Sequence, residues 1–143
     1  MKNYLLKFSS VSENDGDLTY FEAMGDIPFE IKRIFSIYNV PNKKITRANH
    51  ASINTAFVLQ AVVGSVEVEL DNGFQKECFL LNEIDMGLII PKLTWMKTKK
   101  FSKRAVLNVY ASENYESCKY VNDYEKFLEM VNENEKNSDY RSK

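Results

Sequence analysis

The chain has 143 residues and a mass of 16.6 kDa, which suits one domain with a hydrophobic core and leaves little room for two. Hydrophobic residues at 44% and charged residues at 27% are typical of globular proteins and argue against wholesale disorder. The balance of 19 Lys and Arg against 20 Asp and Glu argues against a dedicated nucleic-acid-binding protein.

Short apolar or alternating runs, separated by turn residues, fill most of the chain and predict β-strands. In chain order these runs cover residues 4–8, 18–23, 31–40, 56–63, 66–70, 77–81, 87–90, 93–98 and 105–111. Val and Glu alternate over residues 66–70, which predicts a strand with one face on the core and the other in water. Asn72 and Gly73 follow and predict a tight hairpin turn, since both residue types tolerate a positive φ.

The last part of the chain changes its period. Apolar residues fall at helical spacing from Tyr120 to Val131, which predicts one helix over residues 120–131. Residues 132–143 are almost wholly polar, and we expect them to form a frayed tail. Many short strands followed by one helix predict an all-β sandwich or barrel, built as a single domain over residues 1–131.

From the sequence we expect no membrane-spanning segment, no signal peptide and no structural cysteine pair. No apolar run approaches the roughly 20 residues that cross a bilayer, and the start of the chain is charged too early for a signal peptide. Cys78 and Cys118 form no Cys-x-x-Cys pair, so they indicate neither a disulfide framework nor a zinc site. The sequence therefore predicts a soluble cytoplasmic protein.

His50 is the single histidine of the chain, and histidine is the side chain whose ordinary pKa lies nearest neutrality. It is either a general base or a histidine with a purely structural role. A metal site is not expected, because such sites in β-barrels gather several histidines and a carboxylate. The sequence contains neither a Gly-x-Ser-x-Gly nucleophile motif nor a glycine-rich phosphate loop.

Basic residues and one tryptophan are candidate binding residues. Arg33 and Arg47 lie among strand-like residues, where a guanidinium either pairs with a neighbouring carboxylate or forks onto phosphate oxygens. The basic stretch over residues 97–104 is either a solvated turn or a positive rim for an anion such as a diphosphate. Trp95 either packs in the core or stacks on a base or sugar at a barrel mouth.

Five groups of residues, in order along residues 4–131, resemble the motifs of one protein family. They are DGDL at 15–18 with Glu22, IPFEIKR at 27–33, GS at 64–65 with DNG at 71–73, GL at 87–88 with Trp95 and FS at 101–102, and VLNVYASE at 106–113 with Tyr115, Tyr120 and Tyr124. In this order and spacing the chain resembles the dTDP-4-keto-6-deoxyhexose 3,4-ketoisomerases, the WxcM-like cupins.

The resemblance implies an RmlC-like cupin, an antiparallel jelly-roll barrel with one C-terminal α-helix. It implies a homodimer whose N-terminal strands exchange, and a site that works without a metal or another cofactor. Enzymes of this family move a carbonyl from C4 to C3 of a dTDP-linked 6-deoxyhexose. Their products are sugar precursors of bacterial surface glycans such as lipopolysaccharide.

The chain departs from the family at the catalytic motif, RG-x-HAH, which reads RANHAS here. The first histidine maps onto His50 and the second onto Ser52. Other polar family positions map onto Phe35, Ser36, Ala56, Phe57 and Met96. The resemblance thus implies His50 as the base with Ser52 or a water as its partner, and a substrate site formed by Arg33, Arg47, Trp95 and Met96.

Three hypotheses about function follow from this pattern of retained and lost residues. The chain is a 3,4-ketoisomerase or related isomerase that uses His50, or a dTDP-sugar-binding protein that has lost turnover. The third hypothesis keeps only the fold and dimer as a scaffold. Retention of His50, Arg33 and Arg47 favours a ligand function, while serine at position 52 favours altered or absent turnover.

Overall fold

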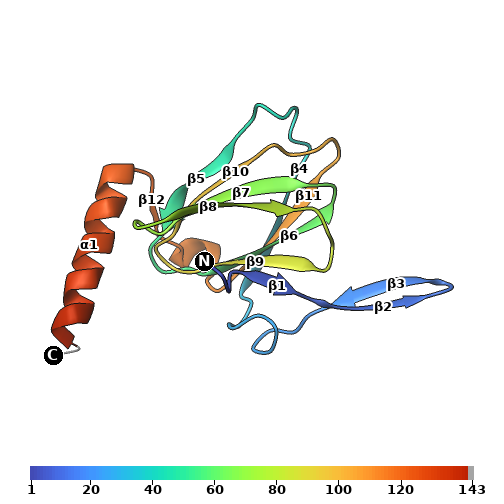
Figure 1. Cartoon of the computed structure of the whole chain (residues 1–143), viewed down its shortest axis with the longest axis horizontal. Helices are drawn as coiled ribbons and strands as arrows, with labels where there is room; N and C mark the ends of the chain where they lie inside the picture. The colour runs from blue at the N-terminus through green and yellow to red at the C-terminus, as the bar shows by residue number, and fades with distance from the viewer. Residues whose placement is uncertain (142–143) are drawn as a thin grey trace.

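The computed structural model describes residues 1–141, which form two five-stranded antiparallel sheets packed face to face (Figure 1). The first sheet has the order β1-β9-β6-β11-β4, with β1 (Leu5–Lys7), β4 (Arg33–Tyr38), β6 (Phe57–Val63), β9 (Met86–Ile90) and β11 (Val106–Ala111). The second has the order β12-β5-β10-β7-β8, with β5 (Arg47–Ser52), β7 (Val66–Asp71), β8 (Lys76–Leu81), β10 (Trp95–Lys99) and β12 (Tyr120–Val121). The hairpin of β2 (Ser9–Glu13) and β3 (Gly16–Tyr20), the short 3-10 helix η1 (Tyr115–Ser117) and helix α1 (Tyr124–Arg141) complete the described chain.

The main core lies between the two sheets. In β7, Val66, Val68 and Leu70 are fully buried, while the glutamates between them are partly exposed, as the alternation predicted. Strands β6, β9 and β11 supply the facing apolar side chains, among them Leu59 and Leu107. Burial of this apolar surface, at about 25 cal/mol per Å², is the main stabilising contribution. The predicted antiparallel two-sheet fold is confirmed.

The turn after β7 has the form that its sequence predicted. Gly73 adopts a φ of 94°, in the left-handed region, and its N–H donates to Asp71 Oδ1 at 2.8 Å. A Cβ on Gly73 would lie 2.7 Å from Cγ1 of Val131 in α1, so the tight turn also leaves room for the helix. Glycine is therefore required here for both conformation and packing.

Helix α1 packs against the outer face of the second sheet, where Phe127 and Val131 bury against Trp95. It begins at Tyr124 rather than at the predicted Tyr120, because residues 120–121 pair with β5 as β12 and Asp123 caps the helix. The Asp123 carboxylate accepts the N–H of Lys126 at 3.2 Å, which satisfies one of the free donors of the first turn.

The C-terminal end of the helix also differs from the sequence prediction. Residues 132–141, expected to form a frayed tail, continue the helix through Arg141, while residues 142–143 lie outside the described residues. Glu133, Glu135, Lys136 and Arg141 are good helix formers, and they extend the helix that Phe127 and Val131 anchor to the sheet. No helix in the described part of the chain is long and apolar enough to cross a membrane.

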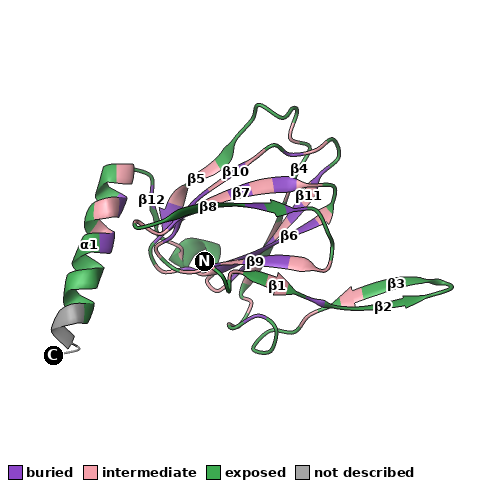
Figure 2. Cartoon of the chain, viewed as in Figure 1, coloured by how far each residue is buried: buried purple, intermediate pink, exposed green. Residues whose placement is uncertain are grey.

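The β2–β3 hairpin projects from the body of the molecule (Figure 1). Its residues are almost all exposed, including Val11, Leu18 and Tyr20 at 46%, 57% and 47%, whereas purple buried segments concentrate in the two sheets (Figure 2). Strand β1, just before it, pairs with β9 of the same chain. The sequence analysis expected β1 and β3 but missed β2 and β5, which contain few β-branched residues, and β12, whose two residues were assigned to the helix.

Candidate active site

A cavity of about 160 Å³ lies between the sheets and is lined from β4, β5, β6, β10, β11 and β12. Most of its lining is apolar: Phe35, Ile37, Ala48, Phe57, Leu59, Met96, Leu107 and Val109. Four side chains bring polar atoms to it, namely Arg47, His50, Thr98 and Tyr120. Small-molecule sites commonly combine an apolar cavity with a few polar groups that orient the ligand.

Strand β5 carries His50 into this cavity through an irregular stretch of backbone. His50 pairs with Met96 of β10 and Ala48 with Lys97, so Asn49 is an extra residue on the β5 side. Ala48 and Asn49 have φ values of 66° and 61°, in the left-handed region that costs non-glycine residues energy. Such bulges are frequent beside active sites, where they redirect side chains.

His50 lies in a largely apolar environment. Its Nδ1 atom is buried and has no hydrogen-bond partner among the described residues. Burial lowers the pKa of its imidazole below 6.5, although the interaction of the ring with its own backbone raises it in part. The imidazole is therefore neutral near pH 7, which is the form that accepts a proton.

Tyr120 is in direct contact with His50. The two rings are 4.4 Å apart between centroids and meet edge to face at 61°. The Tyr120 hydroxyl accepts a long hydrogen bond from the Arg33 guanidinium at 3.5 Å. Burial, followed by the hydrogen bond with Cys118, raises the pKa of the phenol, so it keeps its proton near neutrality and can donate it.

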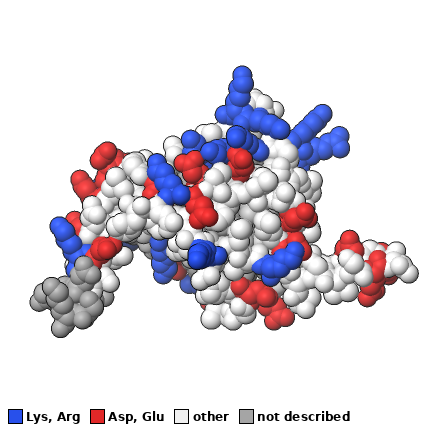
Figure 3. Space-filling view, in the orientation of Figure 1, with Lys and Arg blue, Asp and Glu red and all other residues white. Residues whose placement is uncertain are grey.

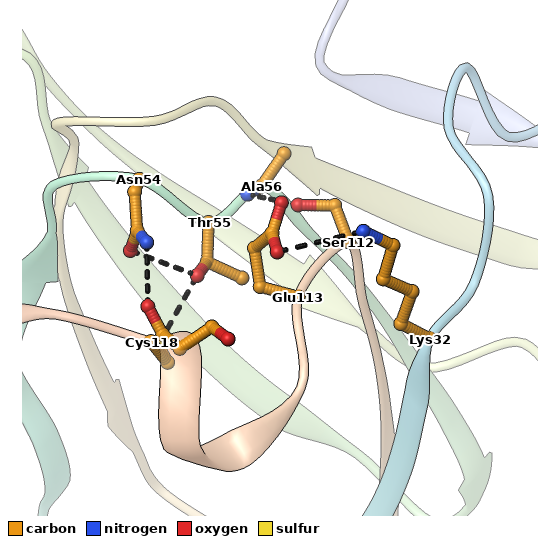
Figure 4. A network of polar contacts seen from close by, with 8 residues as sticks. Lys32, Asn54, Thr55, Ala56, Ser112, Glu113 and Cys118 are labelled. Carbon is orange, nitrogen blue, oxygen red and sulfur yellow. Dashed lines mark hydrogen bonds and ion pairs between the residues drawn. The ribbon is translucent and has the colours of Figure 1, made fainter.

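Behind Tyr120, a polar network joins the β5–β6 turn to the segment between β11 and β12 (Figure 4). The Thr55 hydroxyl lies 3.2 Å from Cys118 Sγ, and Asn54 Nδ2 donates to the Ser117 carbonyl at 2.6 Å. Burial alone would raise the pKa of the Cys118 thiol, but hydrogen bonds from Thr55, Tyr120 and Ser52, with the charge of Arg33, lower it overall. This network fixes the backbone from which Tyr120 reaches the cavity.

The candidate residues from the sequence are only partly brought together. His50, Arg47 and Met96 line the cavity, and Arg33 reaches it through Tyr120. Ser52 does not line it: its hydroxyl is buried, accepts the Thr55 N–H at 3.1 Å and lies 3.4 Å from the Lys119 carbonyl.

Trp95 lies outside the cavity, so the structure does not support the expected contact with substrate. It packs beneath α1 on the outer face of the second sheet, 5.3 Å from the Tyr124 ring, and donates through Nε1 to Asn49 at 3.2 Å. The reason is strand alternation, since Met96 and Thr98 of β10 line the cavity and Trp95 points the other way.

The basic stretch over residues 97–104 divides into paired and free side chains. Lys99 pairs with Glu69 at 3.0 Å and Lys100 with Glu67 at 3.3 Å. Lys103 and Arg104 lie exposed in the β10–β11 loop. Blue side chains gather at the end of the molecule where this loop and the β4–β5 loop lie (Figures 1 and 3).

Tyr120 and Thr98 are the polar cavity residues that the sequence analysis did not predict for the site. Tyr120 belonged to the apolar stripe from which the helix was predicted, and this hid its place in a strand. Thr98 follows Met96 by two residues, so placing Met96 inside would have placed Thr98 inside as well. Among residues 1–138, no group of three or more His, Cys, Asp or Glu side chains is arranged to hold a metal ion.

The arrangement of two antiparallel sheets around a partly apolar cavity defines a cupin-type jelly roll. A dTDP-4-dehydrorhamnose 3,5-epimerase from Bacillus anthracis has the same fold, with a TM-score of 0.70 at 13% identity over 79% of this chain and 73% of that one. At this identity the likeness concerns the fold alone.

Sequence comparison narrows the class to one family. The chain belongs to the FdtA family (WxcM-like, C-terminal), which it matches over residues 1–132. A TDP-4-oxo-6-deoxy-alpha-D-glucose-3,4-oxoisomerase from Aneurinibacillus thermoaerophilus is 29% identical over 131 residues, which are 92% of this chain and 94% of that protein.

Solved structures agree with this assignment. A 3,4-ketoisomerase from Helicobacter canadensis is 38% identical, with a TM-score of 0.84 over 90% of this chain and 96% of that one. The 3,4-ketoisomerase QdtA from Thermoanaerobacterium thermosaccharolyticum, solved as a mutant with TDP-4-keto-6-deoxyglucose, is 33% identical. Its TM-score is 0.85 over 90% of this chain and 93% of that one. The relatives of this chain are therefore TDP-sugar 3,4-ketoisomerases, and the family expected from the motifs is confirmed.

Proposed function

We propose that this protein is a 3,4-ketoisomerase of a dTDP-linked 4-keto-6-deoxyhexose, with a site that differs from the family pattern. The observation that carries the proposal is a neutral, partly buried His50 whose ring contacts the Tyr120 ring in a largely apolar cavity. Carbonyl migration between neighbouring carbons needs a base and a proton donor, and these two side chains have the required protonation states.

The reaction balances with these two groups alone. His50 removes the proton from C3, the C3–C4 double bond forms, and the C4 carbonyl oxygen takes the proton of Tyr120 to give an enediol. The Tyr120 phenolate then removes the proton of the C3 hydroxyl. The C3 carbonyl forms, and C4 takes the proton held by the His50 imidazolium. Both side chains end in their starting state, and the proposed step uses no metal or cofactor.

Tyr120, rather than Ser52, is the proton donor in this proposal, because the Ser52 hydroxyl is buried against Thr55 and Lys119. Tyr120→Phe should lower kcat by about 10²-fold or more, the usual contribution of a positioned acid. Ser52→Ala, the control, should keep kcat within a few-fold. The reverse order of effects would assign the proton transfer to Ser52.

The cavity fits the sugar rather than the whole nucleotide sugar. Its 160 Å³ equals the volume of only about five waters, at roughly 30 Å³ each. The deoxyhexose therefore occupies the cavity, and the diphosphate lies outside it near Arg47 and the basic loops between β4 and β5 and between β10 and β11. Binding of dTDP in EDTA should weaken as salt rises, because exposed charges are screened; strict dependence on a divalent metal would contradict the proposal.

We also propose that the protein is a homodimer in which the β2–β3 hairpin lies on the partner. An isolated two-stranded hairpin is marginally stable in water, and this one exposes Val11, Leu18 and Tyr20. Strand β4 is an edge of the first sheet, with Ile34 and Tyr38 exposed, and offers a surface of matching character. Sedimentation at micromolar concentration should give a dimer, and a monomer would refute this assembly.

The second candidate function is a dTDP-sugar-binding protein without turnover. It is favoured by the apolar residues Phe35, Phe57 and Met96, which line the cavity at positions where the family has polar residues. Incubation with dTDP-4-keto-6-deoxyglucose in deuterated water, followed by NMR, separates the two functions. Deuterium at C3 or C4 and a 3-keto product establish the isomerase, whereas unchanged sugar with measurable binding establishes the binding protein. Through such a product the isomerase would serve the synthesis of bacterial surface glycans in the cytoplasm.

A further inference from the structure

Thr98 lines the cavity and carries a buried hydroxyl that nothing in the described part of the protein binds. The residue is 2% exposed and lines the same cavity as His50. Its Oγ1 atom has no hydrogen-bond partner among the described residues. A buried hydroxyl without a partner is unfavourable in a folded protein, and such groups are rare.

Besides Thr98, the buried polar atoms without a partner in the described residues are Nδ1 of His50 and Nε of Arg33, whose guanidinium also donates to the cavity residue Tyr120. Buried polar side chains away from the cavity are satisfied, as two examples show. The Thr55 hydroxyl lies within hydrogen-bond distance of Asn54 and Cys118, and Gln60 bonds to Tyr110 and to the Ile84 carbonyl. Thr98 differs from Thr55 and Gln60 in facing the cavity, together with the unpartnered Nδ1 of His50. The missing hydrogen bond of Thr98 is therefore a feature of the cavity lining, and it does not reflect poor hydrogen bonding throughout the core.

The strand register sets the separation between the two groups along the cavity. Met96 lies opposite His50 in the β10–β5 pairing, and Thr98 is two residues further along β10. Two residues of extended strand span about 7 Å, which is comparable with the width of a hexose ring with its substituents. A sugar whose reacting carbons face His50 therefore places a substituent on its far side within reach of Thr98.

We propose that Thr98 is a specificity-determining residue whose hydroxyl hydrogen-bonds a hydroxyl of the bound deoxyhexose away from the reacting carbons. The inference deepens the proposed function and rests on the sugar occupying this cavity. Arg47, opposite Thr98 in the register, is exposed and suits the diphosphate, whereas the depth of Thr98 suits the uncharged sugar.

Thr98→Val tests this proposal, because valine keeps the shape of threonine and removes the hydroxyl. Calorimetry with TDP-glucose should show about tenfold weaker binding than the wild type, the factor expected for one hydrogen bond, while binding of TDP is unchanged. The melting temperature without ligand should stay equal or rise, since an unsatisfied polar group is removed. Thr98→Ser should restore binding of TDP-glucose.

Thr55→Val is the matched control, because it removes a buried hydroxyl that has partners and lies outside the cavity lining. Its melting temperature should fall. Equal TDP-glucose binding by wild type and Thr98→Val would overturn the proposal, and so would an equal loss with TDP, which would place the contact on the nucleotide. A wild type that binds TDP-glucose no better than TDP would also overturn it. Absence of isomerisation by a wild type that binds the sugar more tightly than TDP would overturn the proposed function alone.

Discussion

The two faces of strand β10 differ in whether their polar side chains have hydrogen-bond partners. On the outer face, Trp95 has a hydrogen-bond partner in Asn49 and packs under α1, and Lys99 pairs with Glu69. On the inner face, Thr98 has no partner among the described residues, and Met96 lies opposite His50. The outer face is built for stability and the inner face for a ligand, so substitutions on the two faces should have effects of different kinds.

The largest expected effect is on the inner face. His50→Asn keeps a polar side chain of similar size but removes the base, so kcat should fall by about 10²- to 10⁴-fold. The free energy of unfolding should change little, since the buried Nδ1 makes no hydrogen bond to the described protein. Steady-state kinetics and urea unfolding measure the two quantities. Undiminished turnover would remove His50 from the proposed mechanism.

On the outer face, Trp95→Ala should lower the free energy of unfolding by about 3–5 kcal/mol, as is usual for truncation of a buried aromatic residue. The loss arises because Trp95 joins α1, through Phe127 and Tyr124, to the second sheet. Urea unfolding gives the free energy, and TDP binding by the fraction that remains folded should match the wild type. A selective loss of TDP affinity would return Trp95 to the binding site.

A smaller effect is expected from Tyr124→Phe at the edge of the same outer face. The Tyr124 hydroxyl donates to Asp71 Oδ2 at 2.5 Å, and this bond raises the pKa of the phenol to about 12. Its loss should lower the free energy of unfolding by about 1–2 kcal/mol, because the buried carboxylate of Asp71 loses a donor. Wild-type stability in this variant would show that Asp71 finds a replacement partner.

The smallest predicted effect is a shift of the acid limb of the pH–rate profile. Burial lowers the pKa of His50, so the base stays neutral at pH values where an ordinary histidine, with a pKa of 6.5, is half protonated. Activity in kcat/KM should therefore persist through pH 6.5 and fall only as the pH drops through the lowered pKa. An acid limb centred above pH 6.5 would show that the pKa of His50 is not lowered and that its surroundings are more polar than described.

Strand β10 also shows how far the sequence could predict the site. The run over residues 93–98 was recognised as a strand, but Trp95 and Met96 are both apolar, and alternation alone does not say which points inward. The inward face is set by the pairing of β10 with β5, and β5 was not predicted because RANHAS lacks β-branched residues.

The sequence motifs predicted the fold and the family more successfully than they predicted the arrangement of the site. The fold and the family followed from turns, alternation and ordered motifs spread along residues 4–131, and both are confirmed. The surroundings of His50 depend on contacts between segments far apart in sequence, such as that of Tyr120 with Arg33. A single sequence carries no signal for such long-range neighbours, so the motif that contains Tyr120 did not show that this side chain lies between Arg33 and His50.

Because β5 contains one extra residue, the site depends on the number of residues between Arg47 and His50 as well as on their identity. Side chains three positions apart in a regular strand point to opposite faces, yet Arg47 and His50 both line the cavity. They can do so because Asn49 shifts the phase of the strand between them, so that Arg47 pairs with Thr98 and His50 with Met96. If β5 kept its number of residues but lost the bulge at Asn49, one of the two would point out of the cavity, although neither of them would have been mutated.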